Sequence, residues 1–96
     1  MDSSDPVEIP IDGTLDLHSF RPDEAKDLVA EYVRACLPRG ILQVRVIHGK
    51  GTGALRETVH SVLRQMKEVA SFRLAGEDAG GWGATIVILR GEEAHV

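Results

Sequence analysis

The stretch "ILQVRVIHGKGTGALRETV", residues 41–59, decides the fold. Its first part, 41–48, is apolar and β-branched, which predicts an inner strand. Three glycines then fall within five residues, around a lysine, and an amphipathic helical pattern begins near Ala54. The loop "GKGTG" therefore lies at the carboxyl end of a strand, which is where open α/β sheets usually bind their ligands.

The segment before this stretch predicts a first strand and a first helix. Residues 14–18, "TLDLH", alternate as a strand does when one face is buried, with Leu15 and Leu17 on the buried face. Residues 22–37 follow helical spacing, and Pro22 suits the first helical turn. A helix between two strands predicts that these strands run parallel.

The segment after it predicts a second helix at about 54–69 and two further strands at 71–76 and 84–90. The order is βαβαββ, and the last two strands, which a short glycine-rich loop connects, are expected to run antiparallel. Each helix carries one apolar stripe. The pattern predicts an α/β two-layer sandwich, in which a mixed sheet has both helices on one face.

The charge is distributed unevenly. The 96 residues carry a net charge of −4, and six acidic residues lie at the two ends. Residues 13–91 hold 11 basic and 9 acidic residues, a net of +2, which permits contacts with phosphate. The expected organisation is an acidic lead-in at 1–12, one domain at 13–91 and a short tail at 92–96.

The composition also predicts where the protein works. The chain has one cysteine, which excludes an internal disulfide and suits a reducing compartment. The N-terminus lacks the apolar core of a signal peptide, and no apolar run approaches the ~20 residues of a membrane span. A cytoplasmic protein without membrane contact is expected.

The glycine-rich loop is a candidate anion site. Gly49, Gly51 and Gly53 allow positive φ, and the free amides at the start of the following helix attract anions. Lys50 and Arg56 add positive charge. The loop is not a Walker A motif, because the lysine is misplaced and no serine or threonine follows it. The alternative is a turn that simply needs glycines.

Three further polar residues are expected at the same edge of the sheet. Asp16 and His18 share the polar face of the first strand, and His48 ends the next one. Together with the loop they could hold a phosphodiester and activate water. Alternatively, Asp16 caps a turn and the histidines bond to the main chain. His60, on the second helix, is expected to project away from this edge.

Three motifs in this order resemble the small MutS-related (Smr) domain family: "LDLH" at 15–18, "HGKGTGALR" at 48–56 and "GGWGATIVIL" at 80–89. The resemblance implies a sandwich similar to the C-terminal domain of translation initiation factor three. It also implies nucleic-acid binding, often with endonuclease (nicking) activity on DNA or RNA. The family's functional motifs fall on Asp16 and His18, on His48, Gly49, Lys50 and Gly51, and on Gly81, Trp82 and Gly83.

The sequence departs from the family pattern in one place. Many members continue the first motif with glycine, whereas Ser19 follows His18 here, which puts the fine geometry of the substrate in doubt. The chain resembles a short member that stands alone. Trp82 could stack on a base or could cover the edge of the core.

Three functions follow from these residues. The first is a nicking phosphodiesterase, in which Lys50 and the loop amides bind phosphate, and Asp16, His18 or His48 activates water, directly or through Mg²⁺ or Mn²⁺ held by Asp16 and the substrate. The second is a module that binds DNA or RNA without cutting it. The third is a domain that binds a protein partner through its acidic ends and open sheet face.

Overall fold

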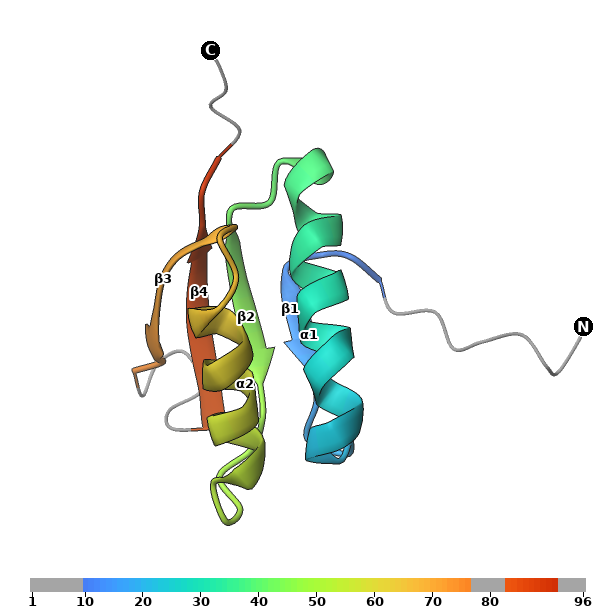
Figure 1. The fold of residues 1–96 in the computed structure, drawn as a ribbon, viewed down its shortest axis with the longest axis vertical. Helices are drawn as coiled ribbons and strands as arrows, with labels where there is room; N and C mark the ends of the chain where they lie inside the picture. Colours follow the sequence, from blue (N-terminus) through green and yellow to red (C-terminus); the bar gives the residue numbers. More distant parts are fainter. Residues whose placement is uncertain (1–9, 77–82, 92–96) are drawn as a thin grey trace, which may run out of the picture.

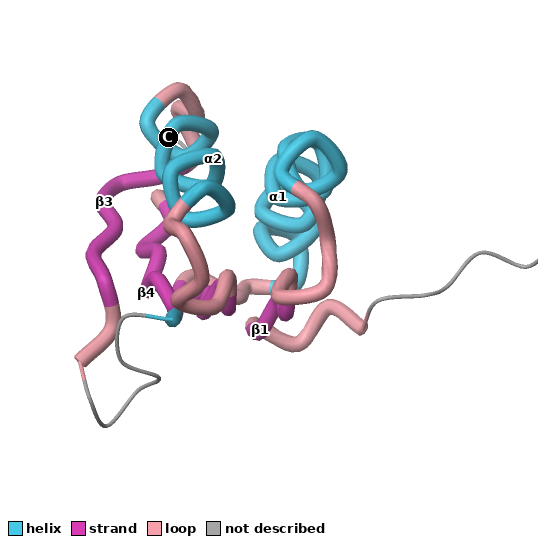
Figure 2. The backbone as a smooth tube through the Cα atoms, turned by 90° about the horizontal axis from the view of Figure 1, so that it is seen from below, coloured by secondary structure: helices cyan, strands magenta, loops and turns pink. Residues whose placement is uncertain are grey.

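The computed structural model describes residues 10–76 and 83–91, and it shows two helices packed on one face of a four-stranded mixed sheet (Figures 1 and 2). In chain order the elements are β1 (Thr14–Asp16), α1 (Pro22–Cys36), the 3-10 helix η1 (Leu37–Arg39), β2 (Gln43–Ile47), α2 (Ala54–Arg64), β3 (Val69–Leu74) and β4 (Ala84–Leu89). The predicted two-layer α/β sandwich and its βαβαββ order are confirmed. Gly81, Trp82, the first nine residues and residues 92–96 lie outside the described part.

The strand order is β1-β2-β4-β3, so the last strand of the chain lies inside the sheet. β1 pairs parallel with β2, with Asp16 opposite Ile47, and β4 runs antiparallel to both β2 and β3. The two strands joined by α2, β2 and β3, therefore point the same way but are separated by β4. The first parallel pair and the antiparallel last pair are as predicted.

The core lies between the sheet and the two helices. Alternate residues of the strands and one stripe of each helix are buried there, among them Leu15, Leu17, Val29, Val46 and Val87. The hydroxyl group of Tyr32 accepts the main-chain N–H of Gly13 at 3.0 Å and so ties the entrance of β1 to α1. β1 is thereby held in register, which fixes where Asp16 and His18 emerge.

The second helix is shorter than its sequence pattern predicts. It ends at Arg64 instead of about residue 69, because Met66 and Val69 turn into the core and their amides bond three residues back, to Leu63 and Met66. β3 begins at Val69 instead of residue 71, and a register irregularity between Val69 and Ser71 absorbs the extra residue. The apolar spacing of a helix thus continues in the sequence beyond Arg64, although tertiary packing ends the helix there.

The other predicted boundaries differ by one or two residues. β1 ends at Asp16, which leaves His18 in the turn that leads to α1. β2 spans Gln43–Ile47, which leaves His48 as the first residue of the loop. None of the helices in the described part of the chain is long and apolar enough to cross a membrane.

Candidate functional site

The loop between β2 and α2 borders a hollow at the edge of the sheet where β1 and β2 end, at the lower end of Figure 1. The hollow has a volume of about 220 Å³. It is lined by His18, Phe20, Pro22, His48, Gly49, Lys50, Gly51, Thr52, Gly53, Ala54, Leu55 and Arg56. All the candidates predicted between residues 48 and 56 therefore lie around one cavity, and His18 joins them from the turn after β1.

Two of the loop glycines adopt backbone conformations that favour glycine. Gly49 has φ +78°, and a Cβ there would lie 3.8 Å from Cβ of His18. Gly53 has φ +92° and is the N-cap residue of α2. Positive φ is strained for residues with a side chain, so both positions favour glycine for its backbone conformation, although a Cβ at Gly49 would have room. Gly51 has φ outside this region and open space around it.

The loop that borders the hollow contains main-chain amides without a protein partner in the described part of the chain. The first helical bond of α2 runs from the Glu57 N–H to the Gly53 carbonyl, so the amides before it have no partner within the helix. Within residues 10–76 and 83–91, the amides of residues 50–53 make no hydrogen bond to the protein. Together with the positive end of the helix dipole, these donors suit an anion.

The side chain of Arg56 folds back over the loop. Its Nη2 atom lies 2.8 Å from the position of a Cβ built on Gly53. A side chain at position 53 would therefore displace the guanidinium as well as strain the backbone. Gly53 and Arg56 together bring a fixed positive charge next to the loop amides, as the sequence predicted for both residues.

Asp16 and His18 form a hydrogen-bonded pair at the rim of the hollow. His18 Nδ1 lies 2.6 Å from Oδ1 of Asp16, and the main-chain N–H of His18 donates to the same oxygen at 3.0 Å. These bonds lower the pKa of Asp16 below its usual value, the side-chain bond contributing most. Because the carboxylate accepts, Nδ1 carries the proton, and Nε2 of a neutral His18 retains its lone pair.

His48 has a different environment. It is 4% exposed, its Nδ1 lies 3.0 Å from the carbonyl oxygen of Gly49, and its Nε2 lies 2.8 Å from Oγ1 of Thr85. Burial has the largest effect and lowers the pKa of His48; the bond to the Gly49 carbonyl opposes this shift, and the nearby charge of Arg56 adds a smaller decrease. Both ring nitrogens thus have partners inside the protein.

Two residues that the sequence did not bring to this edge lie directly behind His48. Nε2 of His60 is 2.8 Å from Oγ1 of Thr85, and the His48 and His60 rings meet edge to face at 6.0 Å between centroids. His60 does not line the hollow, but its ring points toward His48 instead of away from this edge as expected. The available signals were a polar residue within the apolar strand "ATIVIL" and a histidine three residues before the buried Leu63.

Gly83, the one described residue among Gly81, Trp82 and Gly83, holds the main chain of the loop in place. Its carbonyl accepts the main-chain N–H groups of His48 at 2.8 Å and of Gly49 at 2.9 Å. A Cβ at position 83 would lie 3.6 Å from the main chain of Gly49. Gly81 and Trp82, which the sequence also placed in the site, lie outside the described residues.

A metal ion held by Asp16, one of the two routes that the sequence left open, would find few donors among the described side chains. The described residues contain no group of three or more His, Cys, Asp or Glu side chains that could hold a metal ion. Oδ1 of Asp16 is already bound by His18. These side chains do not form a site that would hold a metal ion by themselves.

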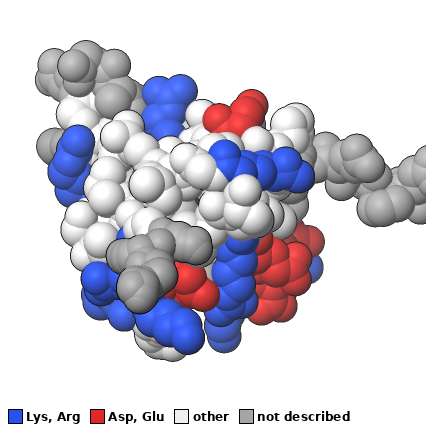
Figure 3. Space-filling view, turned by 90° about the horizontal axis from the view of Figure 1, so that it is seen from above, with Lys and Arg blue, Asp and Glu red and all other residues white. Residues whose placement is uncertain are grey.

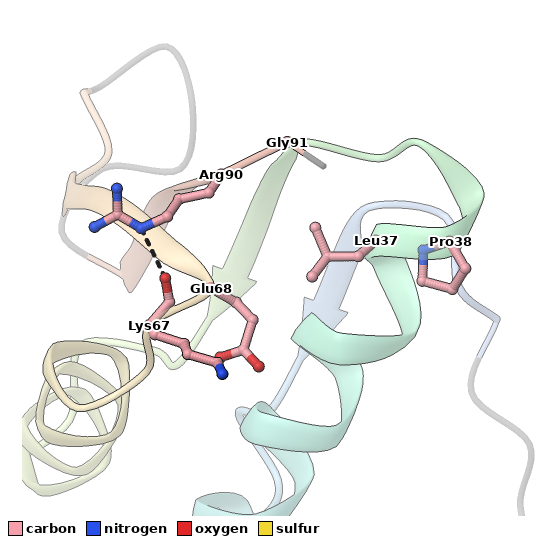
Figure 4. A pocket seen from close by; sticks show the side chains of 6 residues that line it. All are labelled: Leu37, Pro38, Lys67, Glu68, Arg90 and Gly91. Carbon is pink, nitrogen blue, oxygen red and sulfur yellow. Dashed lines mark hydrogen bonds between the residues drawn. The ribbon is translucent and has the colours of Figure 1, made fainter. Parts of the chain in front are cut away.

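A larger hollow, of about 720 Å³, lies at the opposite end of the sheet (Figure 4). It is lined by Leu37, Pro38, Lys67, Glu68, Arg90 and Gly91. Nε of Arg90 donates to the Lys67 carbonyl at 2.7 Å, and Arg34 pairs with Glu68 at 3.3 Å. Figure 3 looks onto this end and shows Lys and Arg side chains spread around its margin. The positive charges here are dispersed, and no loop of free amides accompanies them within the described residues.

Comparison with known proteins identifies the domain. The Smr domain family model matches residues 15–90. Endonuclease MutS2 of Solidesulfovibrio magneticus is 46% identical over 76 residues, and that of Halothermothrix orenii is 43% identical over 77 residues. The matches cover 79% and 80% of this chain but only 10% of each relative, so the chain spans about a tenth of their length.

Two solved structures share the fold. The Smr domain of Thermus thermophilus MutS2 superposes with a TM-score of 0.77 at 39% identity, covering 80% of this chain and 96% of that one. YdaL, a stand-alone small MutS-related protein from Escherichia coli, superposes with a TM-score of 0.76 at 28% identity, covering 81% of this chain and 64% of that one. The chain belongs to the Smr domain family.

Proposed function

We propose that this Smr domain binds DNA or RNA at the hollow beside β1 and β2 and hydrolyses a phosphodiester bond there, with His18 as the general base. The observation that carries the proposal is the 2.6 Å contact between Asp16 and His18 at the rim of a cavity lined by Lys50 and by loop residues whose amides have no partner among the described residues. The similarity to domains of proteins named endonuclease MutS2 supports the same chemistry.

The phosphate is proposed to lie against the loop. The ammonium group of Lys50, the guanidinium of Arg56 and the amides of residues 50–53 supply positive charge and donors on one side of the cavity. Such donors suit the non-bridging oxygens, on which negative charge develops in the transition state. The loop would thus serve both binding and catalysis.

His18 is proposed to take a proton from water. Asp16 holds the proton of His18 on Nδ1, so that Nε2 of this cavity-lining residue keeps a free lone pair. The resulting hydroxide attacks phosphorus, the bond from phosphorus to the leaving oxygen breaks, and that oxygen takes a proton from solvent. Asp16 stabilises the imidazolium that forms.

His48 is proposed to position the loop instead of moving a proton. Its two nitrogens are engaged by Gly49 and Thr85, and it is almost fully buried. A general base must be able to reach the proton that it abstracts. Of the three candidates for this role, His18 has the most exposed side chain, at 66% of its surface against 50% for Asp16.

A cleavage assay tests the proposal. Branched and linear DNA and a structured RNA are incubated with wild-type protein, Asp16→Asn and Lys50→Ala, each with EDTA, Mg²⁺ or Mn²⁺. Asp16→Asn should lower cleavage by at least about tenfold while binding holds, because the amide cannot stabilise the imidazolium. If the wild-type protein cleaves none of these substrates under any condition, the proposed phosphodiester hydrolysis is wrong and only the proposed binding remains.

Binding is measured separately, because a module that only binds uses the same loop. Fluorescence anisotropy across a salt series should show affinity that falls steeply as salt rises, as neutralised phosphates require. Salt-dependent binding without cleavage would identify the domain as a nucleic-acid binding module. Binding that is absent or insensitive to salt would contradict both and favour a protein partner.

A further inference from the structure

A chain of hydrogen bonds runs from α2 through β4 to the glycine loop. Nε2 of His60 contacts Oγ1 of Thr85 at 2.8 Å, the same oxygen contacts Nε2 of His48 at 2.8 Å, and Nδ1 of His48 contacts the Gly49 carbonyl at 3.0 Å. Thr85 is fully buried and His48 is 4% exposed. Water therefore has little access to the middle of the chain.

The direction of this chain follows from one acceptor. A carbonyl oxygen accepts only, so Nδ1 of His48 carries a proton and, in the neutral ring, Nε2 accepts. The hydroxyl group of Thr85 must then donate to His48, which leaves its oxygen to accept from His60. Every hydrogen bond of the chain is therefore donated toward the loop: His60 donates to Thr85, Thr85 donates to His48, and His48 donates to the Gly49 carbonyl.

The last bond determines how one peptide group faces. In a trans peptide the C=O and N–H bonds point in opposite directions. Because the Gly49 carbonyl points back to the His48 ring, the N–H of Lys50 points away from that ring, and it has no acceptor among the described residues. The N–H of Gly49 is held in turn by the Gly83 carbonyl at 2.9 Å. The peptide on each side of Gly49 is therefore anchored.

We infer that Thr85 and His60 are positioning residues that hold His48 with its proton on Nδ1 and thereby keep the Lys50 amide turned toward the cavity. The inference deepens the proposed function, on which it rests for the identity of the ligand. Neither residue lines the cavity itself, so their effect is transmitted through His48 and Gly49, which do. Without the hydroxyl donor, the protonation of His48 and the direction of the peptide are no longer fixed.

Ligand-free NMR tests the positioning itself. The ring ¹⁵N shifts of His48 report its tautomer, and the ¹⁵N–¹H shift of Lys50 reports the environment of its amide. The variants are Thr85→Val, which has nearly the same shape but no hydroxyl group, and Thr85→Ser, which restores the hydroxyl group. Thr85→Val should give a mixture of His48 tautomers and a displaced Lys50 amide signal, and Thr85→Ser should resemble the wild type.

His60 provides a second, milder pair of variants. His60→Leu removes the donor to Thr85, whereas His60→Gln retains an N–H at a similar reach. His60 is half-buried beside Phe72, with 4.8 Å between the two ring centroids, so a leucine retains the apolar contact. The Lys50 amide signal should move in His60→Leu and should return toward its wild-type position in His60→Gln. If Thr85→Val does not fold, this pair decides the inference.

Inorganic phosphate then connects the positioning to binding. Wild-type protein and Thr85→Ser should bind it alike, and Thr85→Val should bind about five- to tenfold more weakly, as expected when a hydrogen bond to a charged ligand is misaligned. The inference is overturned if folded Thr85→Val keeps the wild-type tautomer of His48 and the wild-type amide shift of Lys50. If Thr85→Val does not fold, the same result in His60→Leu overturns it. If both signals move as expected but the wild-type protein does not bind phosphate, the positioning stands and the proposed phosphate loop fails.

Discussion

His18 and His48 leave neighbouring parallel strands at the same edge of the sheet, yet their surroundings are opposite. The side chain of His18 is 66% exposed and touches one carboxylate, whereas His48 is 4% exposed and has partners on both nitrogens. The same residue type at equivalent ends of two strands is thus open to solvent in one case and fixed inside the protein in the other. Burial and partners, more than position in a motif, decide which imidazole can move a proton.

The largest expected effect is on catalysis by His18. His18→Ala removes the proposed base and should lower cleavage by about 10²-fold or more, with nucleic-acid affinity and the urea midpoint nearly unchanged. Initial rates of strand nicking measure the loss. His95→Ala, in the C-terminal tail, is the matched control and should cleave like the wild type. Full cleavage activity of His18→Ala would show that His18 is not the general base and that its exposure does not distinguish it from His48 in catalysis.

The second effect is on stability and concerns His48. His48→Ala deletes a buried ring and leaves Thr85 without its acceptor, so the free energy of unfolding should fall by about 2–4 kcal/mol. His18→Ala, at an exposed site, should change it by no more than about 0.5 kcal/mol. Urea denaturation followed by circular dichroism compares the two. Equal losses would show that exposure does not separate their roles.

The third effect concerns the positive charge of Lys50, which lines the same hollow as His18 and His48. Lys50→Ala should weaken binding to all nucleic-acid sequences and reduce the slope of log affinity against log salt by about one. Lys67→Ala, at the opposite end of the sheet, carries away the same charge and should leave the slope unchanged. A matching loss of slope in Lys67→Ala would move the binding surface to that end.

The smallest expected effect is the pH dependence of stability. Burial lowers the pKa values of His48 and His60 in the folded protein, and His60 is lowered further by His48, Arg64 and Arg56 and raised slightly by Glu57. Below about pH 6.5 the unfolded chain therefore binds more protons than the folded one, and stability falls as pH decreases through this value.

Thermal unfolding between pH 7.5 and pH 5 measures this loss. The wild-type melting temperature should decrease toward pH 5, and His60→Gln, which has one buried imidazole fewer, should show a shallower decrease. His18→Ala is the control. It removes an exposed imidazole and leaves the rings of His48 and His60 in place, so its melting temperature should decrease toward pH 5 as steeply as that of the wild type. A wild-type melting temperature that stays constant or rises toward pH 5 would show that burial does not hold these rings neutral.

The parts of the fold that could be predicted were those fixed by local patterns. The alternation in "TLDLH", the stripe of α1 and the glycines after β2 each reflect interactions within a few residues, and the structure confirms the elements that they predict. The end of α2 could not be predicted, because helical spacing continues to Val69 while packing against the sheet turns Met66 inward. Boundaries set by tertiary contacts leave little trace in a local pattern.

In the candidate site, too, features set by local patterns could be predicted and features set by tertiary contacts could not. The strand order alone predicts that the residues of the loop and His18 meet at one edge of the sheet, where the structure has a cavity lined by them. The link between His60 and Thr85 joins residues 25 positions apart, and it depends on the register of β4 and the rotation of α2. Neither quantity is encoded in the spacing of motifs, so a buried polar contact between distant elements was missed.

The position of β4 also determines when the site can exist. β4 lies between β2 and β3, and it supplies Thr85, while the residue before it, Gly83, supplies the carbonyl that holds the loop. During synthesis the segment through α2 leaves the ribosome first, with β2 lacking its partner on one side. The glycine loop can acquire its anchors only after β4 inserts, through contacts that are distant in sequence and slow to form. Emergence of the last strand thus sets the earliest moment at which the nascent chain can engage a ligand.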